Sequence, residues 1–503
     1  MNNDIIKKKF YTLYEICLAI YIIGFVLYVR DYYYDILSAK FYFFAIGSII
    51  LFLFFIVKNI CLIFNRDRIV INKLRIIDCF LIAFILINFL SWINSPWRNE
   101  LFIAKDYSYL GLVFYICIFL IYISITNLLK TSNIIKIIFP VTLIIESVIG
   151  IIQSLGYDFL GFFKDVLFSE LQVYIGTLGN INVYGEFICT FFAISFYLFC
   201  FNEDSRYTVL YMIAVISGYF GMFCSNSDGC VLGVALCMIV MLYFAFKKSS
   251  YLRKYSFALL GFALVSSIWK LLKYIFKGYM WVQSPTNKIL MGTGFIIVIA
   301  AFAVLLFAIS VYMENKTLKI STYYLILVVS ICVLIGFSIL YFSTLGRNMQ
   351  IGKLSSYLKF DDNWGSDRGY AWIRAAQIFK EAPIKNKIIG YGPSTTQILY
   401  CNYCYDEMIQ KFDAFFSTPH NDLLYYLLTN GAVGVVLYIS IVAVSIKNAM
   451  ACAKKNHLYG AVAAGILVYF LCGMVNITQN ITAPYIYILI SIANTDVIYN
   501  KIN

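Results

Sequence analysis

Residues 289–312 read ILMGTGFIIVIAAFAVLLFAISVY, a run of 24 residues without a charged side chain. A helix needs roughly 20 apolar residues to cross the hydrocarbon core of a bilayer, so this run predicts a transmembrane helix. Thirteen further apolar runs lead to the same prediction. The fourteen predicted spans are 13–29, 41–57, 76–93, 108–125, 134–154, 182–200, 207–224, 230–246, 255–269, 289–312, 321–343, 421–445, 459–475 and 481–498.

The composition of the whole chain supports the same class of protein. Of 503 residues, 62% are hydrophobic and 13% are charged, and the mean hydropathy is +0.81. A soluble domain carries roughly 25% charged residues, so a soluble enzyme, a disordered chain and a fibrous repeat are excluded. The apolar runs do not alternate with polar residues, which excludes a membrane β-barrel. We therefore predict an all-α, polytopic helical membrane protein with about 14 (12–14) transmembrane helices.

The distribution of basic residues predicts the orientation of the chain. Lys and Arg concentrate in the cytoplasmic loops of membrane proteins. If Lys7, Lys8 and Lys9 lie in the cytoplasm, 21 basic residues fall inside and 9 fall in the short outer loops. The other 9 lie in one long outer loop, which the rule exempts. The prediction is a multi-pass protein of the cytoplasmic (inner) membrane with both termini in the cytoplasm. Because its basic residues form short clusters between spans, the net charge of +13 does not indicate a nucleic-acid partner.

Three segments follow from this layout. Residues 1–343 hold spans 1–11, residues 344–419 form the long extracytoplasmic loop, and residues 420–503 hold spans 12–14. The weakest span is 255–269, and its loss would invert every later segment. Two amphipathic helices that lie in the membrane interface are predicted within the loop, Ser366–Glu381 and Asn402–Phe416.

The junction between the long loop and the twelfth span holds one of only two histidines in the chain. Thr418 is a suitable N-cap and Pro419 suits the first helical position, so we expect His420 in the first helical turn. A helix N-terminus disfavours imidazolium and favours anions, which suits a general base beside a phosphate. Gly431 and Gly434 are expected to allow close helix packing.

Two other outer segments accompany His420. The first is Gly176-Thr-Leu-Gly-Asn-Ile-Asn182, and the second is Arg368-Gly-Tyr-Ala-Trp372 followed by Pro383 and Gly390-Tyr-Gly392. Together with His420-Asn421 and the two glycines after it, these segments resemble, in order, the motifs of the O-antigen ligase and O-antigen polymerase superfamily. The resemblance covers residues 176–435.

This resemblance implies a fold, an activity and a set of partners. It implies a fold similar to the membrane-embedded C-type glycosyltransferases, and an enzyme that needs no metal and no cofactor. The implied donor is an undecaprenyl-pyrophosphate-linked glycan, and the acceptor is a hydroxyl of a glycan or lipid at the outer leaflet. Other implied partners are membrane lipids and a chain-length regulator protein.

The resemblance also suggests roles for particular residues. His420 is the candidate base, and Arg368 is the first candidate to grip pyrophosphate, since a guanidinium binds phosphate bidentately. A snorkelling interfacial cation is the alternative for Arg368. The candidate substrate-binding residues are Asn180, Asn182, Glu186, Asp228, Trp372, Arg374 and Asn421. For Asn182, capping of its span is an equal alternative, and Asp228 has the alternative of a turn residue that caps a helix.

One position departs from the family pattern. Family members usually carry a Ser-Arg-Gly/Ala-like step at the outer start of a middle span, whereas this chain has Ser227-Asp228-Gly229. Either another cation compensates, with Lys270, Lys273 and Lys277 as candidates, or Asp228 contacts the acceptor glycan.

Three functions remain open at this level. The missing arginine favours a polymerase, which joins one lipid-linked repeat to another. A ligase, which attaches the finished glycan to lipid A core, protein or wall polymer, is the first alternative. A lipid-linked glycan flippase or other transporter is the second, although the paired repeats with broken helices that are typical of transporters are not evident. A transferase would bring His420, Arg368 and Asn182 to one outer cavity, whereas a transporter would place its polar residues along a central path.

Overall fold

The structure is a computed structural model that describes residues 2–64, 74–130, 133–164, 166, 171–276, 283–315 and 320–495. In these ranges the elements are almost entirely helical. A two-stranded antiparallel ribbon pairs β1 (Tyr174–Ile175) with β2 (Gly179–Asn180). The α-helices are α1 (Asn2–Leu27), α2 (Ile36–Phe64), α3 (Ile76–Ile93), α4 (Leu112–Leu128), α5 (Asn133–Ser154), α6 (Ile181–Phe201), α7 (Thr208–Ser225), α8 (Asp228–Ala245), α9 (Ser249–Ile275), α10 (Pro285–Leu290), α11 (Thr293–Tyr312), α12 (Ile320–Ser343), α13 (Ser355–Leu358), α14 (Trp364–Glu381), α15 (Ile384–Ile389), α16 (Thr396–Phe412), α17 (Asp422–Ala453), α18 (His457–Cys472) and α19 (Ala483–Ala493).

The predicted all-α membrane fold is confirmed. Eleven helices in the described ranges are long and apolar enough to cross a membrane, and α4, α18 and α19 are shorter apolar helices. Each of these fourteen helices overlaps one predicted span, although residues 496–498 of the last span lie outside the described part of the chain. The bounds differ at several ends, and the span predicted over 289–312 is interrupted after Leu290, where α10 ends, and resumes as α11 at Thr293. The span predicted to be weakest is α9, which has 27 residues.

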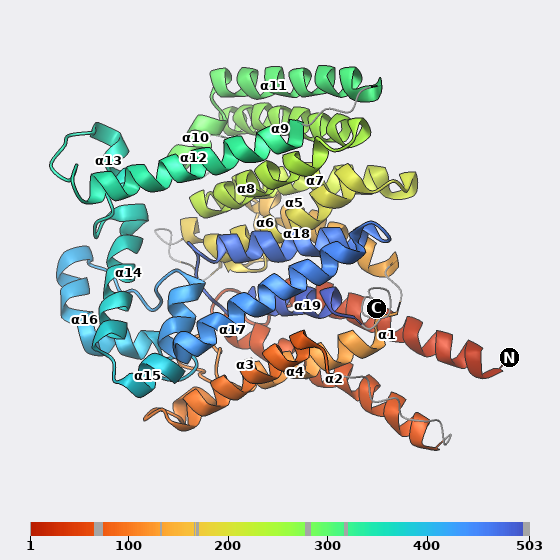
Figure 1. Ribbon diagram of the computed structural model, residues 1–503, viewed down its shortest axis with the longest axis vertical. Helices are drawn as coiled ribbons and strands as arrows, with labels where there is room; N and C mark the ends of the chain where they lie inside the picture. Colours follow the sequence, from red (N-terminus) through yellow and green to blue (C-terminus); the bar gives the residue numbers. More distant parts are fainter. Residues whose placement is uncertain are drawn as a thin grey trace.

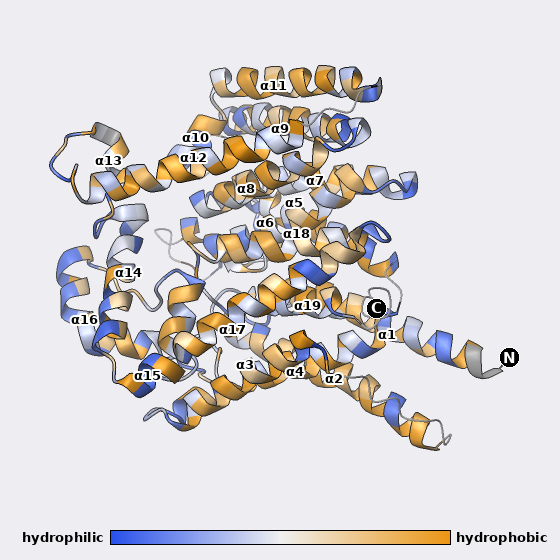
Figure 2. Cartoon of the chain, in the orientation of Figure 1, coloured by the Kyte–Doolittle hydropathy of each residue, from blue (hydrophilic) through white to orange (hydrophobic). Residues whose placement is uncertain are grey.

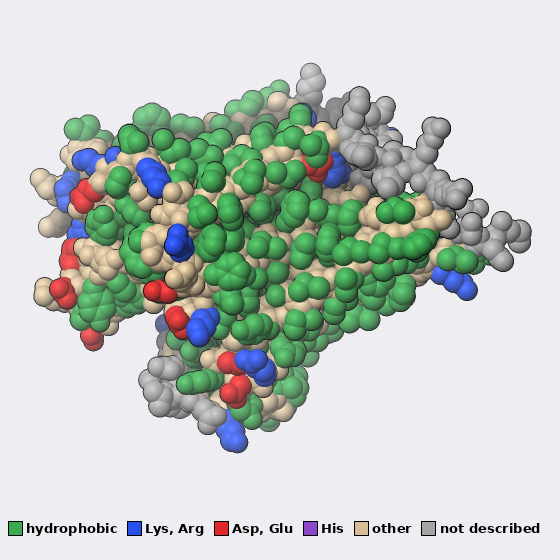
Figure 3. Space-filling view, turned by 90° about the horizontal axis from the view of Figure 1, so that it is seen from below, with side chains coloured by type: hydrophobic (Ala, Val, Ile, Leu, Met, Phe, Trp, Pro, Cys, Tyr) green, Lys and Arg blue, Asp and Glu red, His purple; other side chains and the backbone are tan. Residues whose placement is uncertain are grey.

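The long helices lie roughly side by side, and α14 and α16 run across one end of this bundle (Figure 1). The N-terminus lies toward the opposite end. The bundle is mostly hydrophobic, whereas α14 and α16 carry many hydrophilic residues (Figure 2). The face in Figure 3 is broadly apolar, and many of its charged side chains gather at the end where α14 and α16 lie. This arrangement suits a bundle immersed in lipid with two helices lying along the membrane surface.

Helix α6 lies at the centre of the bundle. Every residue from Val183 to Phe201 is buried, and α6 packs against α5, α7, α8 and α18. At the periphery, α12 has no buried residue. A helix surrounded by protein on all sides presents its polar groups to other protein groups rather than to lipid. The polar residues at the start of α6 therefore face the interior of the protein.

The turn before α6 is held by buried polar residues from α5. Glu146 Oε1 accepts a hydrogen bond of 2.7 Å from the Thr177 amide, and Glu146 Oε2 accepts one of 2.8 Å from Thr177 Oγ1. The Gly176 amide donates to Gln153 Oε1 at 2.6 Å, and Tyr33 donates to the Gly176 carbonyl at 2.7 Å. These bonds fix the Gly176–Asn182 motif against the bundle.

The helices of the long loop differ from the predicted ranges. Gly365, Ser366 and Asp367 all have left-handed backbone conformations, so the regular part of α14 begins at Arg368, and neither Ser366 nor Asp367 caps it in the ordinary way. The second loop helix, α16, begins at Thr396, six residues before the predicted start, and changes direction at Cys404. Both differences arise at short polar stretches, where local propensity defines a helix end poorly.

Cysteine labelling in intact cells tests the predicted orientation. Asp361, Asn402 and Ser250 are exposed, so cysteine at each position should be reactive wherever an aqueous reagent can reach it. In a cysteine-free background, we expect a membrane-impermeant maleimide to label D361C and N402C but not S250C until the cells are opened. The reverse pattern would show that the long loop is cytoplasmic.

Candidate active site

The start of α17 differs from the prediction. Asn421, not Thr418, is the N-cap, and its Oδ1 accepts a hydrogen bond of 3.0 Å from the Leu424 amide. His420 precedes the helix in a left-handed conformation with φ 51°, and its amide donates to Thr418 Oγ1 at 3.3 Å. The first-turn position expected for His420 is therefore wrong. The extended backbone of Asn421 (φ −160°) lets its side chain fold back on the helix start.

Asn421 and Asp422 also join α17 to the segment after α18. Asn421 Nδ2 donates to the Met474 carbonyl at 2.9 Å, and the Asp422 amide donates to the Gly473 carbonyl at 2.7 Å. The buried Asp422 carboxylate accepts hydrogen bonds from Thr478 at 2.5 Å and from Tyr438 at 3.1 Å. Sequence reasoning missed Asp422, although an ionisable residue at the start of a predicted span signals function or a buried polar network.

Gly431 breaks α17 at the point where α15 packs closely against it, so the expected role of this glycine in close helix packing is confirmed. Its φ of 67° and ψ of −171° interrupt the helix, and a Cβ there would collide with the Ile388 backbone. The break leaves carbonyls that the long loop satisfies. The Tyr391 amide donates to the Leu428 carbonyl at 2.9 Å, and the Gly392 amide donates to the Thr429 carbonyl at 3.0 Å. Two glycine-containing motifs far apart in sequence therefore form one backbone junction.

Gly434 serves this junction too, since a Cβ there would strike the side chain of Asn430. Asn430 Nδ2 donates to Asn88 Oδ1 at 2.9 Å, and Ser91 Oγ donates to the Thr429 carbonyl at 2.6 Å. Helix α3 therefore also holds the broken part of α17, and Ser91 shares the Thr429 carbonyl with Gly392 of the long loop.

Arg368 projects from the first turn of the regular part of α14. The preceding left-handed turn brings its Nη1 within 2.6 Å of the Gly365 carbonyl, and its buried Nε has no hydrogen-bond partner among the described residues. The next residue, Gly369, packs directly on the Asp361 carbonyl, where a Cβ would not fit. Gly369 thus lets α14 pack closely on the Asp361 backbone, while Arg368 keeps N–H groups that can donate hydrogen bonds to a ligand.

One small pocket collects residues from four parts of the chain. Asn182 and Glu186 of α6, Ser227 and Gly229 at the start of α8, Arg368 of α14, and Asn476 beyond α18 line it. Arg368 is the one cation in its described lining. Ser227 Oγ donates to Asn182 Oδ1 at 2.7 Å, and Asn476 Nδ2 donates to the Asn182 carbonyl at 3.1 Å. The pocket lies at the end of the bundle that α14 crosses.

His420 lies beside this pocket. Burial and the nearby Arg368 guanidinium lower the pKa of His420 to about 4, so the imidazole is neutral at physiological pH. Its buried Nδ1 has no hydrogen-bond partner among the residues that the structure describes. Arg368 in turn interacts electrostatically with Asp228, which opposes the lowering of the Arg368 pKa by burial. A neutral imidazole, a guanidinium and a carboxylate thus lie within electrostatic range at one site.

Comparison with known families matches the region that carries these residues. The family model described as O-antigen ligase matches residues 289–439. This match supports the predicted assignment to the O-antigen ligase and O-antigen polymerase superfamily. No curated protein matches the chain. The matched O-antigen ligase region supplies Arg368 and His420, whereas Asn182, Glu186 and Asp228 lie outside it.

The structure also places the remaining predicted residues of the candidate site. Asn180, not Asn182, caps α6, because its Oδ1 accepts a hydrogen bond of 2.8 Å from the Asn182 amide. The alternative that Asn182 is merely a cap is therefore wrong. Glu186 and Asn182 share the pocket, and the buried Glu186 Oε2 has no hydrogen-bond partner among the described residues. Both hydrogen-bonding groups of Asn421 are used within the protein.

Two residues of α14 that were predicted to bind substrate, Trp372 and Arg374, contact other parts of the long loop. Arg374 forms an ion pair with Glu407 of α16, donates to Gln377 at 2.7 Å, and lies over the Tyr370 ring at 5.0 Å. Trp372 packs in an aromatic cluster with its ring centroid 5.2 Å from Trp364 and 6.1 Å from Phe360. The structure therefore does not bring Arg374 into the pocket, and substrate binding by Arg374 or Trp372 remains a prediction.

The lysines suggested to compensate for Asp228 are not found in the pocket. Lys270 Nζ donates to Thr293 Oγ1 at 2.7 Å, which directs it to α11. Lys273 is absent from the described pocket lining, and Lys277 lies outside the described residues. Arg368 is instead the cation that interacts with Asp228.

Gly431→Ala tests the junction between α17 and the long loop. The Gly431 conformation is essentially restricted to glycine, so alanine should cost about 1–3 kcal/mol from backbone strain alone, and its Cβ would meet the Ile388 backbone. We expect a lower melting temperature for the detergent-solubilised protein, measured by size-exclusion chromatography after heating.

Gly336→Ala in α12 is the matched control, because nothing lies within 4 Å of a Cβ built there. That variant should melt at the wild-type temperature or slightly above it. Equal melting of the two variants would show that the Gly431 junction does not constrain the fold.

Proposed function

We propose that this protein is a membrane glycosyltransferase that polymerises a surface polysaccharide. It transfers a glycan from undecaprenyl pyrophosphate to the hydroxyl of an acceptor at the outer leaflet. The observation that carries the proposal is the proximity of His420 and Arg368 at the pocket that Asn182 lines. The family match to O-antigen ligase supports the same reaction class.

The reaction breaks the bond between the anomeric carbon of the glycan and the pyrophosphate oxygen. A bond forms between that carbon and the acceptor oxygen, the acceptor proton moves to a base, and lipid pyrophosphate leaves. The leaving group is already activated, so the enzyme must stabilise its negative charge and remove one proton. We propose that protein side chains meet both needs without a metal.

Arg368 is proposed to bind the pyrophosphate. It is partly buried, it is positively charged at any working pH, and its Nε is free among the described residues. A planar guanidinium can donate two parallel hydrogen bonds to phosphate oxygens, and these bonds strengthen as charge moves onto the leaving group.

His420 is proposed to accept the proton of the acceptor hydroxyl. With its pKa near 4 in the empty site, the imidazole is ready to take a proton but is a weak base. A bound pyrophosphate adds negative charge beside it and offsets Arg368, which raises the pKa of His420. The base therefore becomes stronger when the donor is in place.

Two alternatives differ from this proposal in acceptor or in reaction. A ligase would use the same site with a lipid A core, protein or wall-polymer acceptor, and the family match does not separate it from a polymerase. The absence of the family arginine at Asp228 is our reason to propose the polymerase, and the Asp228 carboxylate could accept hydrogen bonds from hydroxyls of the acceptor glycan. A flippase is disfavoured, because Arg368, Asn182 and Glu186 gather in one pocket rather than along a central path.

Arg368→Lys tests the bidentate role. Lysine keeps the charge but loses the planar fork. Loss of one charge-assisted hydrogen bond should lower the transfer rate about tenfold or more, measured in membrane vesicles with the lipid-linked donor. Arg347→Lys, in an exposed part of the same loop, is the matched control and should retain the wild-type rate. If Arg368→Lys retained the wild-type transfer rate, the bidentate role would be wrong and Arg368 would be only an interfacial cation.

His420→Asn tests the base, because asparagine can form hydrogen bonds but cannot accept a proton at neutral pH. The transfer rate should fall roughly 10²–10⁴-fold, while the variant still inserts and binds lipid pyrophosphate. In the wild type, the acid limb of kcat/KM should lie near pH 4, since the neutral imidazole is the active form and protonation removes it. The acid limb of kcat should lie at higher pH, because it reports the donor complex.

His457→Ala is the control for His420. His457 begins α18 at the far end of that helix from Gly473 and the pocket, so it should have no effect on transfer. In cells, a polymerase lacking its base leaves single repeat units on the surface, whereas a ligase lacking its base accumulates long lipid-linked chains. Substantial activity of His420→Asn would make His420 an orienting group.

A further inference from the structure

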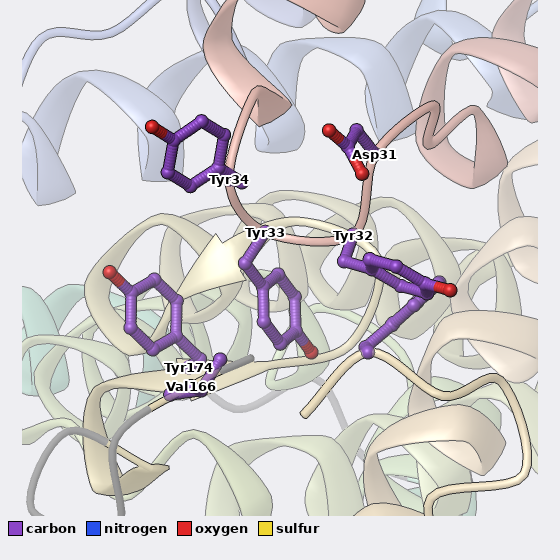
Figure 4. Close-up of a pocket in the computed structure, with 7 residues that line it drawn as sticks. Asp31, Tyr32, Tyr33, Tyr34, Val166 and Tyr174 are labelled. Atoms are coloured by element: carbon purple, nitrogen blue, oxygen red, sulfur yellow. The ribbon is translucent and has the colours of Figure 1, made fainter. Parts of the chain in front are cut away.

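A second pocket opens beside the turn that precedes α6. It has a volume of about 420 Å³, within the range of small-molecule sites, and it lies where the α1–α2 connection meets the chain between α5 and α6. Its lining includes Asp31, Tyr32, Tyr33, Tyr34, Phe162 and Tyr174. Figure 4 shows Tyr33 between Tyr174 and Tyr32, with Asp31 and Tyr34 on the same connection above them.

The tyrosines form a preorganised aromatic surface. Tyr33 and Tyr174 stack with ring centroids 5.0 Å apart and an interplanar angle of 17°, and Phe162 meets Tyr33 edge-on at 5.4 Å. Tyr33 is buried and forms the wall, whereas Tyr34 is 93% exposed. Aromatic faces carry partial negative charge and attract polarised C–H groups, such as those on the face of a pyranose ring.

Asp31 adds a free carboxylate to this surface. The neighbouring Arg30 is taken up by an ion pair with Asp35. Among the residues that the structure describes, the exposed Asp31 side chain has no cationic or hydrogen-bonding partner. A carboxylate accepts hydrogen bonds through two oxygens, a geometry that suits adjacent sugar hydroxyls.

A short chain of contacting residues links this pocket to the candidate active site. Tyr174 pairs with Asn180 across the β1–β2 ribbon, and paired residues in such a ribbon lie about 5 Å apart. Asn180 bonds the Asn182 amide, and Asn182 lines the active-site pocket. Tyr33 also donates to the Gly176 carbonyl at 2.7 Å, so the pocket wall and the active-site turn share a residue.

We propose that this pocket binds the sugar residues of a polysaccharide chain, as a second glycan subsite beside the active site. Stacked tyrosines with one free carboxylate suit neutral or amino sugars. The described lining offers no cation for a phosphate, and Asp31 repels one. An acyl or polyprenyl tail would leave the carboxylate and tyrosine hydroxyls without partners. This role rests on the proposed transferase function. In that reaction, the subsite would hold the polysaccharide chain several sugars away from the reacting bond.

The test measures binding of lipid-free oligosaccharides, released from the host's own surface polysaccharide by mild acid, to the full-length protein in nanodiscs. Asp31→Ala and Tyr34→Ala change exposed side chains, so both variants should fold. Each should weaken binding about fivefold or more, and inorganic pyrophosphate should not compete. Asp106→Ala and Tyr157→Ala are matched controls at exposed positions outside the pocket and should bind like wild type.

Activity separates this proposal from the transferase proposal. In cells, Asp31→Ala and Tyr34→Ala should shorten the polysaccharide chains, whereas His420→Ala should abolish transfer and still bind the oligosaccharide. Oligosaccharide binding that is absent in wild type, equal in all variants, or displaced by pyrophosphate would overturn the subsite. Binding that depends on Asp31 and Tyr34 in a protein without transfer activity would overturn only the transferase proposal.

Discussion

The unsatisfied carbonyls of a broken helix determine how this molecule is assembled at its functional end. Inside a membrane protein, a backbone group without a partner costs several kcal/mol, so a helix can break only where other protein groups complete its hydrogen bonds. Helix α17 breaks at Gly431, and the amides of Tyr391 and Gly392 complete it. This junction holds the long loop against the bundle. Since α14 belongs to the same loop, the junction also restricts where Arg368 can lie relative to His420.

A second buried network holds the turn before α6. Lys40 is fully buried and donates to the Phe25 carbonyl at 2.9 Å and the Val26 carbonyl at 2.5 Å, where α1 ends. Thr177 also donates to the Val26 carbonyl at 2.6 Å, and Glu146 accepts from Thr177. Buried charged groups are tolerated only when they are paired or hydrogen-bonded. The network thus links the end of α1 to the turn that presents Asn180 and Asn182.

The sequence predicted the fold well because the bilayer imposes a simple rule. Long, predominantly apolar runs must become helices, and each of the fourteen predicted runs contains one. Arg368 and Asn182, which the motifs single out, line one pocket, and the roles given to them stay predictions. Local details were less predictable, because Thr418-Pro419 and Asn421 are both good helix starts by composition. The choice of Asn421 depends on Met474, 53 residues away, which accepts its second hydrogen bond. The break at Gly431 likewise depends on distant residues of the loop.

The charges of the site couple the proposed base to the proposed donor. Burial and the positive charge of Arg368 disfavour a proton on His420, and Asp228 is the acidic residue that acts on Arg368 within the described part of the chain. A pyrophosphate bound by Arg368 reverses that field, and the same imidazole then gains affinity for a proton. An acceptor hydroxyl that arrives first meets a weak base, and one that arrives after the donor meets a stronger base. In the proposed reaction, the charge of one guanidinium near His420 therefore couples the strength of the base to the presence of the donor.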